Sequence, residues 1–177
     1  MVKKNKKYPA FSLLELVMAI FILSLITLTA VSVFANIVRT RKNAIKAAND
    51  IEAGREAIEI MAKNIRMGSH LSPGGSSNLI YFFSEVTGEC ISYSISGNRL
   101  NSAAAAPSGT DCTPGAVNYT YQPMTRSDMT VTGSFVVTQT NTTSTPKVIG
   151  RVTTVLLIDG KYNLQTTISI RNYEGII

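Results

Sequence analysis

Hydrophobic and polar positions divide this chain into three stretches. The first, residues 11–38, is almost entirely apolar, and Glu15 is its only charged residue. A helix of that length spans about 42 Å, compared with about 30 Å for the hydrocarbon core of a bilayer. The pattern therefore predicts a helix long enough to cross a membrane, with one carboxylate near its start.

The second stretch, residues 39–67, repeats apolar residues every three or four positions and places charged residues on the other faces. This spacing is typical of an amphipathic helix, which would continue the apolar one and pack on the domain that follows. Gly54 interrupts the stripe at a cost of about 1 kcal/mol, and Gly68 is expected to cap the helix end. The predicted stripe consists of Ala44, Ala48, Ile51, Ile58, Met61 or Ala62, and Ile65.

The third stretch, residues 68–177, has short alternating runs separated by Gly, Ser and Asn, which predict strands and turns. Its clearest element is a hairpin in which residues 152–158 and 161–171 flank Asp159-Gly160, a dipeptide that suits tight turns. We interpret residues 101–114 as a surface loop. The expected fold class is α+β, with one long N-terminal helix packed on a C-terminal antiparallel β-sheet.

The net charge of +6 lies mostly ahead of the apolar stretch. Without four lysines there, 17 − 4 = 13 basic side chains remain against 11 acidic ones, which argues against nucleic acid as the main partner. Four more cations follow the apolar stretch, so the positive-inside rule alone does not orient the helix. The two sets are Lys3, Lys4, Lys6 and Lys7, then Arg39, Arg41, Lys42 and Lys46. For two basic tracts of the helix, residues 39–42 and 63–66, a solvated helix face is the simplest interpretation, and lipid headgroups, acidic neighbours in a filament and DNA are alternatives.

Cys90 and Cys112 are the only cysteines, and neither has metal-ligand spacing. A disulfide between them would close a loop of about 20 residues, contribute about 3 kcal/mol and require an oxidising compartment. Two unpaired thiols are the alternative. We find no nucleophile with a base, no phosphate-binding loop and no metal motif around the single histidine, His70. The expectation is a protein that is not an enzyme and uses no metal or cofactor.

The start of the apolar stretch carries a motif. Residues 9–15, PAFSLLE, resemble the cleavage and methylation site of type IV pilins and type II secretion pseudopilins, typically Gly-Phe-Thr-Leu-x-Glu before an apolar run. The resemblance implies that a prepilin peptidase cuts after Ala10, where the family usually has Gly, and N-methylates Phe11. It also implies that Glu15 pairs with the terminal amine of a neighbouring subunit. A contact with its own amine or with the headgroup region is the alternative.

The resemblance further implies the lollipop fold of pilin-like proteins and a division of the chain. Residues 1–10 would be a leader peptide, 11–38 the transmembrane and filament-core half of the helix, 39–67 its amphipathic half and 68–177 a globular β-rich domain. The chain would sit in the inner (cytoplasmic) membrane as a single-pass protein with its C-terminal domain outside the cytoplasm, and then enter a filament. Its partners would be the prepilin peptidase, other pilin or pseudopilin subunits, the inner-membrane assembly platform and, before assembly, the lipid bilayer.

The opening Leu-Leu-Glu and the residues around 55–66 and 167–172 are similar to J-type minor pseudopilins and to minor type IV pilins, which favours a low-copy subunit. Two alternatives remain open. Signal peptidase would release a secreted binding protein by cutting after Val33-Phe34-Ala35, before Asn36. An uncut chain would be a single-pass membrane-anchored protein with no role in a filament.

Overall fold

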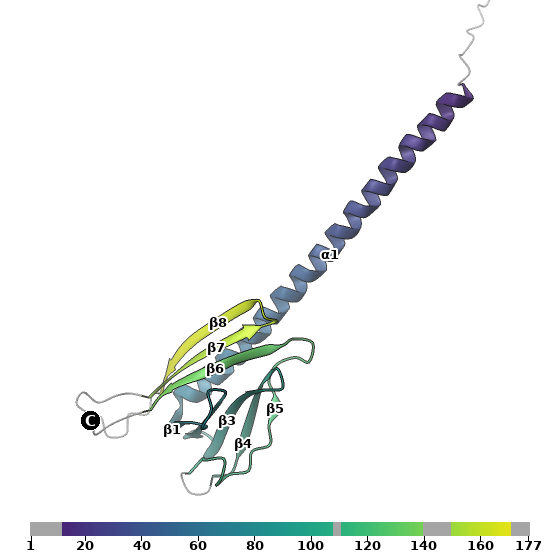
Figure 1. Ribbon diagram of the computed structural model, residues 1–177. Helices are drawn as coiled ribbons and strands as arrows, with labels where there is room; N and C mark the ends of the chain where they lie inside the picture. The colour runs from purple at the N-terminus through teal and green to yellow at the C-terminus, as the bar shows by residue number, and fades with distance from the viewer. Residues whose placement is uncertain (1–11, 108–110, 140–149, 171–177) are drawn as a thin grey trace, which may run out of the picture. The chain divides into compact units, whose positions relative to one another are not determined.

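The computed structural model describes residues 12–107, 111–139 and 150–170 (Figure 1). The chain is α+β, as predicted: a single long helix, α1 (Leu13–Arg66), precedes the strands of an all-antiparallel region. The residues form two compact units, of which the first ends at Ala47 and the second begins at Ala48. The second unit holds the last five turns of α1 and all described strands. These are β1 (Gly68–Pro73), β2 (Leu79–Ser84), β3 (Glu89–Ser96), β4 (Arg99–Ala105), β5 (Gln122–Pro123), β6 (Val131–Thr138), β7 (Arg151–Ile158) and β8 (Tyr162–Ser169).

The strands make two sheets, whereas the sequence led us to expect one. One sheet has the order β1-β2-β3-β4-β5 and the other the order β6-β7-β8. Backbone hydrogen bonds join the two: the Val131 N–H donates to the Asn98 carbonyl, and the Phe135 N–H donates to the Ser77 carbonyl. The division into two sheets follows from which strands pair with each other, and local sequence patterns do not predict that pairing.

The C-terminal part of α1 supplies one side of the main core. Its buried residues follow helical spacing, but they are only partly the predicted stripe. Met61, Ala62 and Ile65 are buried as expected, whereas Ala44 and Ala48 are exposed. The buried face continues N-terminally through residues of low hydrophobicity because the sheet packs closely there. The complete set is Asp50, Gly54, Ala57, Met61, Ala62 and Ile65.

Two glycines have packing roles that the sequence analysis misassigned. A Cβ added at Gly54 would lie 2.3 Å from Ile158 Cδ1, so the missing side chain lets the β7–β8 hairpin approach α1. Gly68 was predicted to cap the helix end, but it begins β1 and lacks the positive φ that glycine caps commonly have. A Cβ there would lie 2.4 Å from the Phe82 ring, so Gly68 also makes room for a neighbour.

The predicted hairpin is confirmed. Strands β7 and β8 pair in full register, and the turn residues Asp159 and Gly160 have φ of 50° and 64°. Positive φ at both residues is what the Asp-Gly dipeptide was expected to supply. The turn is one residue longer than predicted, because Ile158 pairs with Tyr162 and Lys161 also lies in the turn. In contrast, the predicted loop over residues 101–114 is partly wrong, because Asn101 to Ala105 belong to β4 and pair with β3.

Candidate functional site: the apolar segment of α1 and its flanks

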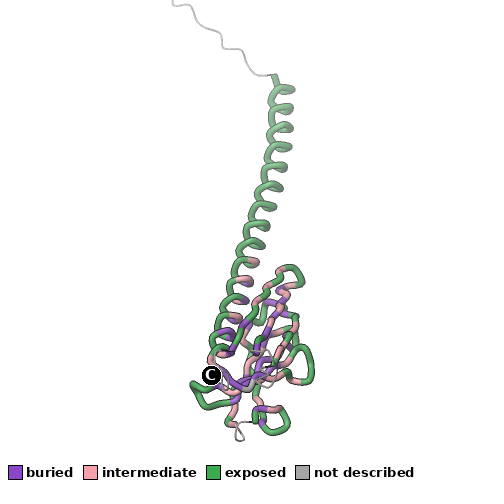
Figure 2. Tube along the Cα trace, turned by 90° about the vertical axis from the view of Figure 1, so that its left-hand side faces the viewer, coloured by how far each residue is buried: buried purple, intermediate pink, exposed green. Residues whose placement is uncertain are grey.

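The part of α1 that we call the apolar segment, residues 13–38, is entirely solvent-exposed in the chain (Figure 2). Its large hydrophobic side chains are between 49 % and 81 % exposed, and Glu15 is its only charge. Such a continuous apolar surface far exceeds the few hundred square ångströms found on soluble monomers. Lipid or another apolar protein surface must therefore cover it. By length and composition, it suits a membrane span and equally a signal sequence.

Four hydroxyl groups interrupt the apolar segment, and each donates a hydrogen bond within the helix. Each hydroxyl donates a hydrogen bond to a backbone carbonyl three or four residues earlier, with oxygen–oxygen distances of 2.7–2.8 Å. Because a hydrogen-bonded hydroxyl costs far less to place in an apolar medium than an unpaired one, these residues are compatible with a bilayer or a dry protein interface. The donors and acceptors are Ser24 to Phe21, Thr27 to Leu23, Thr29 to Ile26, and Ser32 to Thr29.

The start of α1 is held by a side-chain cap. The Glu15 N–H donates to Ser12 Oγ at 3.2 Å and to the Ser12 carbonyl at 3.1 Å, which satisfies one of the free amides of the first turn. Glu15 itself is exposed. The predicted cleavage site, Ala10 and Phe11, and the predicted methylation at Phe11 lie outside the described residues, so the pairing of Glu15 with a terminal amine stays a prediction.

The role of Ser12 was not among the predictions, although its sequence signal is present. Ser12-Leu13-Leu14-Glu15 is the Ser-x-x-Glu pattern that opens many helices. In the structure Ser12 occupies the position just before α1, and its Oγ accepts a hydrogen bond from the backbone N–H of Glu15. The acidic residue in the first turn also complements the positive end of the helix dipole.

Four cations follow the apolar segment, and we call Arg39, Arg41, Lys42 and Lys46 the basic collar. All four are exposed and all lie in the first compact unit. Residues 39–46 include no acidic side chain. The collar therefore marks a sharp change along the helix from apolar to strongly basic surface.

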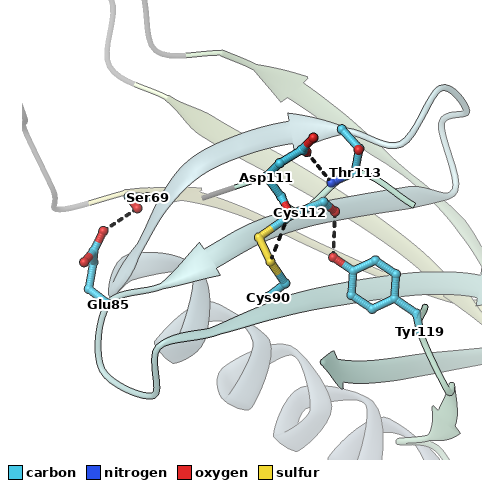
Figure 3. The surroundings of a disulfide bond; sticks show 7 residues. All are labelled: Ser69, Glu85, Cys90, Asp111, Cys112, Thr113 and Tyr119. Atoms are coloured by element: carbon cyan, nitrogen blue, oxygen red, sulfur yellow. Dashed lines mark hydrogen bonds between the residues drawn. A yellow bond between two sulfur atoms is a disulfide. The ribbon is translucent and has the colours of Figure 1, made fainter. Parts of the chain in front are cut away.

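In the second unit, the predicted disulfide between Cys90 and Cys112 is present, with Cα atoms 5.3 Å apart (Figure 3). It joins β3 to the connection between β4 and β5, and with Val117 it forms a small second core. Tyr119 is held nearby by donating its hydroxyl to the Cys112 carbonyl at 2.7 Å. Burial, followed by the neighbouring Tyr121, Tyr81 and Asp111, raises the pKa of Tyr119 to about 12. The bond indicates that this unit matures in an oxidising compartment.

A second polar feature lies between α1 and the five-stranded sheet, beside a hollow of about 330 Å³. There Asn64 Nδ2 donates to the Tyr93 hydroxyl at 2.8 Å. Burial raises the pKa of Tyr93 and the Asn64 bond partly offsets that rise, so Tyr93 is neutral at physiological pH. The residues that line the hollow include no carboxylate, imidazole or thiol, so this pair stabilises the packing. Among the described residues, no group of three or more His, Cys, Asp or Glu side chains is placed to hold a metal.

Comparison with family models, curated proteins and solved structures found no match to this chain. The architecture is pilin-like. An apolar N-terminal helix precedes antiparallel sheets, and the last turns of that helix form part of the core of the β unit. These features and the motif at residues 9–15 are the observations that bear on the function of the protein.

Proposed function

We propose that this protein is a structural subunit of a type IV pilus or a type II secretion pseudopilus, and a minor subunit of it. The exposure of the whole apolar segment carries the proposal, because the helix belongs to a chain whose C-terminal domain is folded and disulfide-bonded. A signal peptide that is removed would not need to continue into the core helix of the mature domain. The resemblance of residues 9–15 to a prepilin cleavage motif supports retention of the helix.

The helix suits a transfer between two apolar surroundings. In the membrane, lipid chains cover the apolar segment; in a filament, the helices of sibling subunits would do so, and the free energy of the apolar side chains changes little between the two. The internally bonded hydroxyls are satisfied in both places. Glu15 is the exception, because burying a carboxylate in the bilayer costs free energy, up to about 2.5–3.5 kcal/mol at the centre and less toward the surface, and a carboxylate gains when it meets a cation. We infer that it meets the terminal amine of a neighbouring subunit and so favours incorporation.

The N-terminus of the mature protein tests this function. The chain is expressed in a Gram-negative host together with a prepilin peptidase, and the membrane-bound product is analysed by N-terminal sequencing and mass spectrometry. We expect a chain that begins at Phe11 and carries one methyl group on its amine. A mature chain that begins at Asn36, or one that keeps its first ten residues, would contradict the proposal.

The role of Glu15 has its own test. Glu15→Gln removes the charge and keeps the shape, so membrane insertion should be unchanged or improved while incorporation into sheared filaments is lost. Glu52→Gln is the matched control, because Glu52 is also an exposed carboxylate on α1 and lies outside the apolar segment. Incorporation of Glu15→Gln at the level of this control would show that the carboxylate has no pairing role.

A further inference from the structure

Three of the four cations of the basic collar have no counter-charge among the described residues. Within the part of the chain that the structure describes, Arg39, Arg41 and Lys42 form no ion pair, and all three are exposed. The residue before them, Val38, ends the apolar segment. Three cationic side chains thus lie at the end of an apolar surface that must be covered by lipid or protein.

The collar cations lie on two opposite sides of the helix. At about 100° per residue, Lys42 and Lys46 lie within about 60° of Arg39 around the helix axis, whereas Arg41 lies about 200° from it, on the opposite side. An acidic stripe on a neighbouring helix contacts one face only. A plane of phosphate groups through which the helix passes contacts every side, so the arrangement favours a membrane surface.

A shallow hollow beside Arg41 has the same order of polarity as a phospholipid. Val33, Ile37 and the amide of Asn36 lie within the apolar segment, and the hydroxyl of Thr40 and the guanidinium of Arg41 follow on the collar side, before Ala44. Such a surface suits an acyl chain at one end and an ester and phosphate at the other. The hollow is lined by Val33, Asn36, Ile37, Thr40, Arg41 and Ala44.

We propose that the basic collar and this hollow bind anionic phospholipid headgroups on the membrane face toward the C-terminal domain. The inference rests on the proposed function, since it requires a chain that stays in the membrane with its helix intact. Long Arg and Lys side chains can reach the phosphates while their alkyl stems stay against apolar surface. The contact sets the depth of the helix in the bilayer and holds the subunit there until assembly.

The test measures lipid selectivity around the full chain. The protein is reconstituted in phosphatidylcholine vesicles that carry a trace of spin-labelled phosphatidylglycerol or spin-labelled phosphatidylcholine, and electron paramagnetic resonance gives the fraction of each lipid immobilised by the protein. We expect about fivefold preference for phosphatidylglycerol, the factor that corresponds to about 1 kcal/mol for a cation near an anionic surface. Raising the salt to 0.5 M should reduce it, because ions screen the attraction.

The variant Arg39→Gln/Arg41→Gln/Lys42→Gln should reduce the preference to less than twofold. The matched control, Arg55→Gln/Lys63→Gln/Arg66→Gln, removes the same charge from exposed positions of α1 in the second unit and should keep the wild-type value. Equal preference in wild type for both lipids, or equal loss in both variants, would overturn the inference. So would a collar variant that keeps its lipid preference but no longer enters filaments, since the collar would then bind acidic side chains of neighbouring subunits.

The two proposals fail in different ways. The spin-label measurement uses the uncut chain with Lys3, Lys4, Lys6 and Lys7 replaced by Gln in every sample, so it depends neither on where the chain is cut nor on the cations ahead of the apolar segment. Absence of the lipid preference together with a mature N-terminus at Phe11 rejects the collar as a lipid site and leaves the filament function standing. A mature N-terminus at Asn36 rejects the filament function itself.

Discussion

Gly54 offers a sharp test of how the hairpin packs on α1, because two effects of replacing it with alanine oppose each other. In a helix interior, Gly→Ala normally stabilises by about 1 kcal/mol. Here the new Cβ would lie 2.3 Å from Ile158 Cδ1 and 3.0 Å from Leu164 Cδ1. Ile158 is 0 % exposed, so its methyl group has no free space to enter. Overpacking of this kind costs about 1–3 kcal/mol, and we expect a net loss of about 1 kcal/mol.

The assay is urea unfolding of the full chain in a mild detergent, followed by near-ultraviolet circular dichroism of the tyrosines. With an m-value of about 2 kcal/mol per molar urea, the midpoint for Gly54→Ala should fall by about 0.5 M. Ile158→Val removes the clashing methyl group and should by itself cost about 1 kcal/mol as a cavity. The double variant should recover close to wild-type stability, because the alanine methyl fills the space that valine leaves.

The sign of the result decides the matter. A midpoint that rises by about 0.5 M for Gly54→Ala, as helix propensity alone predicts, would refute the close approach of β7 to α1. Additive losses in the double variant would do the same, since two residues in contact should show a coupling free energy.

Three further predictions concern the second unit. Replacing Cys90 and Cys112 together with alanine should cost about 3 kcal/mol of unfolding free energy, and in urea unfolding a loss below about 1 kcal/mol would contradict this. The pKa of Tyr119 is about 12 in the folded chain and about 10 in the unfolded chain, so its contribution to stability should be complete below pH 10 and be lost as the pH rises from 10 to 12. In Tyr119→Phe, the unfolding free energy should decrease less over this pH range. The same pH profile in wild type and variant would contradict this prediction. A Cβ at Gly133 would lie 2.0 Å from the Val155 carbonyl oxygen, so Gly133→Ala should shift β6 and lower the melting temperature by several degrees, whereas Thr132→Ala, at the exposed neighbouring position, should change it little.

The elements that could be predicted from the sequence are those fixed by nearby residues or by chemistry. The long helix followed from unbroken apolar and amphipathic periodicity, and the hairpin followed from Asp159-Gly160 between alternating strands. The disulfide followed from there being only two cysteines. In each case the decisive information lay within a few residues or in a residue type with one common use.

What could not be predicted depends on contacts between distant segments. The alanines of β4 look like loop residues until β3 pairs with them, and Gly54 looks like a defect in the helix until Ile158 packs on it. For the candidate site, the apolar segment and the cations that follow it could be identified from the sequence. Their complete exposure, and the internal bonding of the hydroxyls, required the structure.

The hydroxyl groups in the middle of α1 have one more consequence. Because Ser24, Thr27, Thr29 and Ser32 donate their hydroxyl protons to their own backbone, that stretch offers no free hydroxyl proton to a neighbouring helix. The surface of this stretch is apolar and has little directional preference for a neighbour. In the proposed filament, the directional contact made by this part of the helix would therefore be the one at its start, where Glu15 lies.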